Sequence, residues 1–360
     1  MIIGFLILVS LFTTIHAECN GGSSLCNTSY SDITQLITHD SYALSPNIAA
    51  TQDYTIIDQL NDGVRGIKLT AVPSINDPLQ INLCHTFCRV LDAGPATETL
   101  NTIAAWLEEN PKEVVTIMWN NLNNFKATEL AQVYLTSNIM PMVFTHSIGD
   151  EWPTIQSMID TGKRAVNFID AEADSDQVPW LMDQFSRVFE TPYDNTDIDA
   201  FNCNVDRIGD DFSPDDLMYV MNHFMYANID LGTFKVQIPL RSKALITNGR
   251  ESLTNHANSC TDIFQKKPNF IEVDFYTMGD ALDVVAEMNG VASVPLLSSK
   301  VSAASRNVSS SPVALRPKLS PTEHVLIDNS IDSSGFRNHY RSYLSIVLML
   351  FVSFPLIIRF

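Results

Sequence analysis

Short apolar runs alternate with longer amphipathic stretches between residues 31 and 290. Runs of this length, bounded by polar and turn residues, predict buried strands. They lie at 33–38, 64–71, 79–83, 114–119, 164–170, 217–222, 244–247 and 270–276. Two other segments predict helices, because their apolar residues recur at helical spacing: 97–109, which Asn110-Pro111 ends, and 279–289, which Gly290 ends.

Strands that alternate with helices over about 260 residues predict a parallel sheet. At this length the expected fold is a single α/β domain, a TIM-type (β/α) barrel, over residues 18–290. The run at 244–247 is short. We therefore expect the barrel to be distorted or incomplete.

The two ends of the chain predict targeting segments rather than fold. Residues 1–17 form an apolar stretch that ends in His16-Ala17, which is typical of a signal peptide. Residues 291–332 are rich in Ser, Ala, Val and Pro, as in a flexible stalk. Within 333–360, small residues, a polar spacer and an apolar tail follow one another, the pattern of a GPI signal with attachment at Ser333. A single-pass membrane span is the alternative.

The net charge of −19 argues against a nucleic-acid partner, which needs a basic face. All six cysteines follow the expected signal peptide, and six cysteines in an oxidising compartment predict three disulfides among 15 possible pairings. The simplest pairing is local: Cys19 with Cys26, Cys84 with Cys88, and Cys203 with Cys260. A metal site at Cys84-His85-Cys88 is the rival interpretation. Sequons at Asn27 and Asn307 predict glycosylation in the same compartment.

Several polar side chains follow predicted strands, and in a barrel the carboxyl ends of the strands surround one mouth. These residues are His39, His85, Asn120, Asp170, Asn222 or His223, and Asp274. Two histidines at strand ends can serve as a general base and a general acid. A single histidine there is more often structural, so the prediction depends on the pair and its surroundings.

The order of several motifs resembles the X region of phosphatidylinositol-specific phospholipases C, and most closely the secreted PLC-like phosphodiesterases of fungi. The matching segments are Thr38-His39-Asp40-Ser41-Tyr42, Gln59 to Arg65, Leu83-Cys84-His85-Thr86, Asp92-Ala93-Gly94, Trp106 to Thr116, and Pro268 to Tyr276. The resemblance spans about residues 19–290.

The resemblance implies cleavage of an inositol phospholipid by intramolecular phosphoryl transfer. His39 would be the general base and His85 the general acid, with Asp40 and Asp274 holding the imidazole tautomers. Asp40 has an alternative role in a turn, and Asp274 one as a buried barrel carboxylate. Head-group contacts would come from Lys68, Asn120, Asp170 and Tyr276. We expect no cofactor, no metal ligand, a monomer, and a secreted protein held at the outer leaflet by its lipid anchor.

The second strand departs from the family pattern. Bacterial members have an aspartate where Lys68 stands, an arginine where Thr70 stands, and a lysine near Asn120. Signalling members have a calcium ligand in this strand. Lys68 and Thr70 share one face of the strand, so we expect Lys68 to supply the positive charge that a phosphorane requires.

Two other functions fit less well. Glycerophosphodiester phosphodiesterases share the barrel, but they need His-Arg-Gly where this chain has His39-Asp40-Ser41, and a Glu-x-Asp pair on the second strand. The stronger alternative is a cell-surface binding protein on a catalytically degenerate phospholipase scaffold.

Overall fold

The computed structural model describes residues 18–230, 235–293, 295 and 296. The expected signal peptide, most of the stalk, Asn307 and the GPI signal with Ser333 lie outside these residues. Among the described residues, no helix combines the length and the apolar composition that a membrane span needs.

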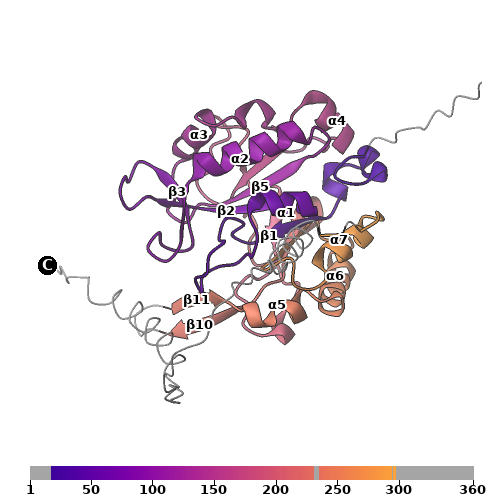
Figure 1. The fold of residues 1–360 in the computed structure, drawn as a ribbon. Helices are drawn as coiled ribbons and strands as arrows, with labels where there is room; N and C mark the ends of the chain where they lie inside the picture. The colour runs from indigo at the N-terminus through magenta and orange to yellow at the C-terminus, as the bar shows by residue number, and fades with distance from the viewer. Residues whose placement is uncertain (1–17, 231–234, 294, 297–360) are drawn as a thin grey trace, which may run out of the picture. The chain divides into compact units, whose positions relative to one another are not determined.

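Eight parallel strands form a curled sheet whose spatial order is β7-β6-β5-β2-β1-β12-β9-β8 (Figure 1). Their bounds are β1 Gln35–Thr38, β2 Gly66–Pro73, β5 Val115–Asn120, β6 Ala165–Ile169, β7 Met182–Asp183, β8 Val188–Glu190, β9 Met218–Asn222 and β12 Phe270–Val273. The order follows the chain around a barrel, and in the described part no ladder joins β7 to β8. The expected α/β fold, an incomplete TIM-type barrel, is confirmed.

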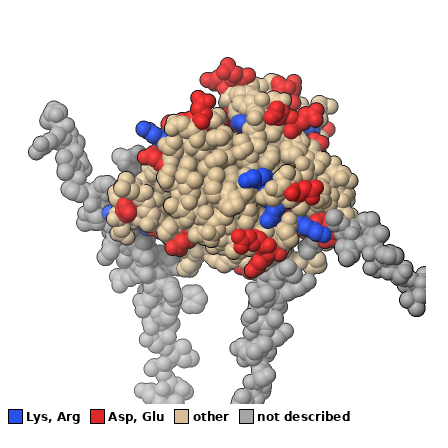
Figure 2. Space-filling view, turned by 90° about the horizontal axis from the view of Figure 1, so that it is seen from above, with Lys and Arg blue, Asp and Glu red and all other residues tan. Residues whose placement is uncertain are grey.

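Helices cover the outside of this sheet. They are α1 Ile56–Asp62, α2 Ala96–Glu109, α3 Ala127–Leu135, α4 Ile155–Thr161, α5 Arg241–Thr247, α6 Arg250–Phe264 and α7 Ala281–Met288, with 3-10 turns at Ser23–Asn27, Tyr30–Asp32, Met140–Met142, Ile198–Ala200 and Pro214–Asp216. The two predicted helices correspond to α2 and α7. On the face that Figure 2 shows, the few Lys and Arg side chains lie among acidic ones.

The predicted strand at 244–247 is wrong, because these residues belong to α5. Ala244 and Thr247 are buried, whereas Leu245 and Ile246 between them are exposed. Burial at every third residue is a helical period, and a four-residue apolar run does not reveal it.

The predicted strand at 79–83 exists but lies outside the barrel. It is β3, Ile81–Cys84, which pairs antiparallel with β2 and with β4, Asp92–Pro95. His85 therefore follows an outlying hairpin rather than a barrel strand. A second antiparallel ribbon, β10 Tyr226–Asp230 with β11 Lys235–Pro239, follows β9.

The barrel interior is mainly apolar toward the amino ends of the strands, apart from a buried hydrogen-bonded group of Tyr30, Thr116 and Gln35, and it is charged at their carboxyl ends. Ile37, Met118 and Val220 belong to a buried cluster that the disulfide Cys19–Cys26 also joins. Gly66 faces Ile37 so closely that a Cβ there would lie 2.2 Å from the Ile37 side chain. The apolar half forms the core. The next inward-facing residues toward the carboxyl ends of the strands form the mouth.

Candidate active site

His39 lies directly after β1 and is held on three sides. Its Nδ1 lies 2.9 Å from Asp274 Oδ1, just past β12. The ring stacks on Phe224, with centroids 4.4 Å apart and planes 1° from parallel. The Tyr226 hydroxyl lies 3.1 Å from Nε2. An Nδ1–H donated to Asp274 leaves Nε2 with the lone pair that a general base needs.

The surrounding carboxylates govern the protonation of His39. Burial alone would lower its pKa, but the charges of Asp274, Asp40 and Glu272, with the Asp274 hydrogen bond, raise the pKa to about 9. Burial in turn raises the pKa of Asp274, against the opposing effect of His39. At neutral pH the imidazole is therefore mainly protonated.

His85 lies beside Asp40, the residue that follows His39. Its Nε2 is 3.9 Å from Asp40 Oδ2, and the Thr70 hydroxyl donates to Asp40 Oδ1 at 2.6 Å. Asn120 Nδ2 in turn donates to Thr70 Oγ1 at 3.3 Å. Thr70 thus orients the carboxylate beside His85.

Lys68 is buried in the mouth between two carboxylates from other strands. Its Nζ lies 3.5 Å from Glu190 Oε1 and 3.9 Å from Glu272 Oε2. These charges outweigh the cost of burial and raise the pKa of Lys68. Lys68 is therefore a compensated cation in this structure, and it remains charged.

Arg207 forms the outer side of this charged cluster. Its guanidinium pairs with Glu190 and lies 3.8 Å from Asp170 Oδ2. The cations Lys68 and Arg207 lower the pKa of Glu190 to about 2, against the burial that would raise it. Arg207 is partly exposed and stacks over Tyr193, so the cluster reaches the surface of the mouth.

Two expected head-group residues have partners that bear on their role. Asp170 accepts from the backbone N–H of Asn121 at 2.8 Å and faces Arg207, so it belongs to the mouth. The Tyr276 hydroxyl instead donates to Asp62 on α1 at 2.8 Å. This bond gives Tyr276 a structural partner on the outer layer.

The residues that follow His39, His85 and Asp274 share a rare backbone conformation. Asp40, Thr86 and Phe275 have φ values of 39°, 60° and 48°. Positive φ is unfavourable for β-branched and bulky side chains, and such strain concentrates at functional sites. Each of these three strained residues directly follows a residue of the candidate site.

The sequence did not assign Phe224, Tyr226, Glu190, Arg207 or Glu272 to the site. Glu190 and Glu272 sit at inward positions of β8 and β12, and strand parity on 270–276 places Glu272 on the same face as Asp274. β8 has only three residues, too few to show a periodic pattern. Arg207 comes from a loop, for which the sequence carries no comparable signal.

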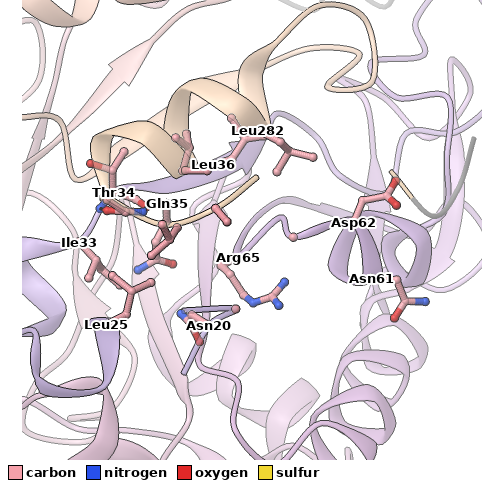
Figure 3. Close-up of a pocket in the computed structure, with 17 residues that line it drawn as sticks. Asn20, Leu25, Ile33, Thr34, Gln35, Leu36, Asn61, Asp62, Arg65 and Leu282 are labelled. Carbon is pink, nitrogen blue, oxygen red and sulfur yellow. Dashed lines mark hydrogen bonds between the residues drawn. The ribbon is translucent and has the colours of Figure 1, made fainter. Parts of the chain in front are cut away.

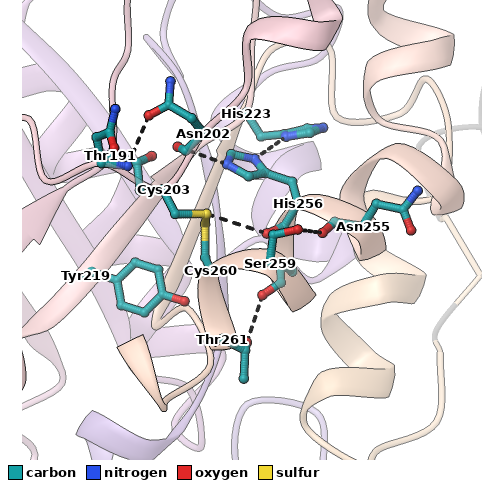
Figure 4. Close-up of a disulfide and its surroundings, with 12 residues drawn as sticks. Thr191, Asn202, Cys203, Tyr219, His223, Asn255, His256, Ser259, Cys260 and Thr261 are labelled. Carbon is teal, nitrogen blue, oxygen red and sulfur yellow. Dashed lines mark hydrogen bonds between the residues drawn. A yellow bond between two sulfur atoms is a disulfide. The ribbon is translucent and has the colours of Figure 1, made fainter. Parts of the chain in front are cut away.

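The structure has the three expected disulfides, and Figure 4 shows the one between Cys203 and Cys260. Among the described residues, two groups could by position hold a metal ion, and each contains a disulfide pair: Cys203, His256 and Cys260, and Cys84, Cys88 and Asp92. Disulfide sulfurs are not thiolate ligands. The rival metal interpretation of the Cys84–Cys88 loop is therefore not supported.

His223, the other histidine at a strand end, packs behind the barrel instead of in the mouth. Its Nδ1 lies 2.8 Å from His256 Nδ1 (Figure 4). Its Nε2 lies 2.8 Å from the Thr247 carbonyl. Burial, together with His256, lowers the pKa of His223 to about 3. This pair is a neutral structural contact.

A cavity of about 190 Å³ lies at the amino ends of the strands, the end opposite to the mouth (Figure 3). Arg65 lines it, but its guanidinium already bonds Glu113 and the carbonyls of Leu60 and Val64. The remaining lining includes apolar residues such as Leu36 and Leu282. No reactive group converges there from the described residues.

The chain is similar to one family model and to two fungal proteins. The PI-PLC X model matches residues 25–289. PI-PLC X domain-containing protein 1 of the fungus Arthroderma benhamiae is 34% identical, over 76% of this chain and 90% of its own length. An uncharacterized secreted protein of the same fungus is 33% identical over 76% of this chain, which spans 64% of that relative.

The fold has a counterpart among solved structures. The phosphatidylinositol-specific phospholipase C from Listeria monocytogenes aligns with a TM-score of 0.50 at 15% identity, covering 73% of this chain and 95% of that one. The likeness at this identity concerns the fold alone. The family match and the fungal relatives show that the chain belongs to the PI-PLC X domain family.

Proposed function

We propose that this protein is a phosphodiesterase that cleaves an inositol phospholipid by intramolecular phosphoryl transfer. The observation that carries the proposal is the arrangement of two histidines with separate carboxylate partners at one barrel mouth. His39 bonds Asp274 through Nδ1, and His85 faces Asp40. This is the arrangement that a base and an acid with different tasks require.

In the proposed reaction, neutral His39 accepts through Nε2 the proton of a hydroxyl adjacent to the phosphodiester. The hydroxyl oxygen bonds to phosphorus, and the bond from phosphorus to the diacylglycerol oxygen breaks. His85 gives its proton to that leaving oxygen. The products are diacylglycerol and a cyclic inositol phosphate, with the proton of the hydroxyl left on His39.

The charge of the phosphorane needs a nearby cation. We propose Lys68 for this role, because it remains charged and lies in the mouth. Arg207 supports this role by pairing with Glu190, because the pair leaves less of the negative charge of Glu190 to offset the positive charge of Lys68. Asn120 and Asp170 are the proposed head-group contacts. We assign Tyr276 no part, because its hydroxyl bonds Asp62.

Two features of His39 shape the expected activity. Its pKa of about 9 means that the neutral base is a minority form at pH 7. The Tyr226 hydroxyl also lies where the attacking hydroxyl would approach Nε2. Substrate must therefore displace Tyr226, and the neutral fraction of His39 increases from pH 7 toward pH 9.

We further propose that the protein is secreted, monomeric and held at the cell surface by a GPI anchor. The three disulfides support an oxidising compartment. Asn27 is exposed and open to glycosylation.

The test is inositol phosphate release from labelled phosphatidylinositol by the full-length protein, with and without a chelator. We expect release that the chelator does not abolish. His39→Ala and His85→Ala should each reduce it at least a thousandfold, and Lys68→Met about a hundredfold. If the double variant His39→Ala His85→Ala releases as much inositol phosphate as the parent chain, the proposal is contradicted and the binding-protein alternative is favoured. Unchanged turnover by Lys68→Met would remove Lys68 alone from the mechanism.

A further inference from the structure

The two proposed proton-transfer histidines differ in the contacts that hold their rings. His39 has a hydrogen-bond partner on each ring nitrogen and stacks on Phe224. His85 Nε2 lies 3.9 Å from Asp40 Oδ2, beyond hydrogen-bond distance, and its Nδ1 lies 3.4 Å from the hydroxyl of Thr86. The side-chain contacts described for His85 therefore orient its ring only weakly.

The backbone around His85 is instead fixed by a closed loop. The disulfide between Cys84 and Cys88 brings their Cα atoms to 4.8 Å, whereas four extended residue steps would span about 13 Å. Inside the loop the N–H of Phe87 donates to the His85 carbonyl at 2.6 Å, and Thr86 between them has a φ of 60°. A β-branched residue rarely adopts this conformation, so the surrounding loop closure holds it there.

The disulfide also anchors this loop to β2, the strand that carries Thr70. Val72, two residues after Thr70, forms a buried cluster with Cys84 and Cys88. Cys88 Sγ lies 3.4 Å from the carbonyl of Pro73, at the end of the same strand. One strand therefore fixes the loop and, through the Thr70 hydroxyl, the carboxylate that faces the histidine.

We propose that the Cys84–Cys88 disulfide positions His85 for protonation of the leaving group and takes no part in activating the attacking hydroxyl. This inference rests on the proposed function, in which His85 gives its proton to the departing oxygen. Cys84 and Cys88 are positioning residues, because they act through His85. A general acid contributes only while its N–H is within reach of the leaving oxygen. Loss of the disulfide should therefore slow only those reactions whose leaving group needs a proton.

The test compares two leaving groups in the full chain and in its variant Cys84→Ala Cys88→Ala. Diacylglycerol needs a proton to leave phosphatidylinositol, whereas para-nitrophenolate leaves the corresponding inositol phosphodiester without one. We expect the variant to lose about tenfold to a hundredfold in kcat for phosphatidylinositol, with KM unchanged, and less than about threefold for the para-nitrophenyl ester. Equal losses for the two substrates, or no loss for phosphatidylinositol, would overturn the proposal.

Two further variants separate positioning from a loss of stability. Cys19→Ala Cys26→Ala removes another short disulfide, which packs in the core at the amino ends of the strands, and should affect both substrates equally. A glycine inserted between Thr86 and Phe87 lengthens the closed loop but keeps its disulfide. This insertion should reproduce the selective loss, and it provides the test if the alanine variant does not fold. A selective loss in the Cys19→Ala Cys26→Ala control, or equal effects of the insertion on both substrates, would contradict the proposal.

A measurement without substrate keeps this inference separate from the proposed function. In an NMR spectrum of the histidine-labelled chain, the imidazole resonances of His85 and His39 are assigned by their loss in His85→Ala and His39→Ala. In Cys84→Ala Cys88→Ala the His85 resonance should shift or broaden, while that of His39 stays in place. If the parent chain is inactive and this result is found, the proposed function alone is contradicted. An unchanged His85 resonance would overturn the positioning role.

Discussion

Two histidines follow strands of the same barrel in opposite electrostatic environments. His39, after β1, has Asp274, Asp40 and Glu272 near it, and its pKa is raised to about 9. His223, after β9, has another histidine as its neighbour, and its pKa is lowered to about 3. Both are well shielded from solvent.

The difference shows that a histidine at a strand end is not by itself a catalytic signal. Burial disfavours the imidazolium at both places, and only the carboxylates at the mouth reverse that effect. The neighbours from β12 and the loop after β1 therefore distinguish the proposed acid–base group, His39, from the packing group, His223. Each prediction below changes one of these environments and leaves the other intact.

The largest effect should follow Asp274→Asn. The amide still fits beside His39 Nδ1, but it can favour the tautomer in which Nε2 carries the proton, so the base loses its lone pair. We expect turnover of phosphatidylinositol to fall about a thousandfold or more, with little change in thermal unfolding. Turnover within tenfold of the parent would show that the carboxylate does not orient the base.

A smaller effect, on stability alone, should follow His256→Leu. This change leaves His223 Nδ1 buried without its partner, at a cost of about 1–3 kcal/mol in the free energy of unfolding. Urea denaturation measures this loss, and His256→Gln, which keeps a polar group there, should lose less. Turnover of the folded protein should stay within a factor of two or three. A larger loss of turnover would make the His223 pair part of the catalytic machinery.

The smallest effects concern the pH dependence of stability, where the two histidines should have opposite signs. The folded-state pKa of His39 lies above the unfolded value, so its contribution is complete below about pH 6.5 and is lost as the pH rises toward 9. The folded-state pKa of His223 lies below that value, so its contribution is complete above about pH 6.5 and is lost as the pH falls toward 3.

Urea titrations at several pH values, compared with His39→Asn and His223→Asn, measure these two contributions. Each slope should be at most about 1.4 kcal/mol per pH unit. If the contributions of both residues to the unfolding free energy changed with pH in the same direction, the two histidines would not lie in opposite electrostatic environments.

The barrel strands were predictable where an apolar run is long enough to show its limits, as on β2 and β5. β7 and β8 were not, because they have only two and three residues. The run at 244–247 was mistaken for a strand, because four residues do not distinguish a buried strand from one face of a helix.

Local sequence motifs predicted part of the candidate site. His39, His85, Asp40 and Asp274 come from motifs, and strand parity correctly placed Lys68 and Thr70 on one face. Parity describes one strand only, so it could not show that Glu190 from β8 and Glu272 from β12 already compensate Lys68. Nor could it place Tyr226 on Nε2 of His39, since that contact depends on how the β10–β11 ribbon leaves the barrel.

The outlying position of His85 gives the two proposed proton-transfer groups different mechanical supports. His39 is fixed to a strand with parallel partners on both sides, β12 and β2. His85 is held by a four-residue antiparallel strand and the Cys84–Cys88 loop. Reduction of that disulfide would therefore loosen the support of His85 and leave the strand pairings beside His39 intact.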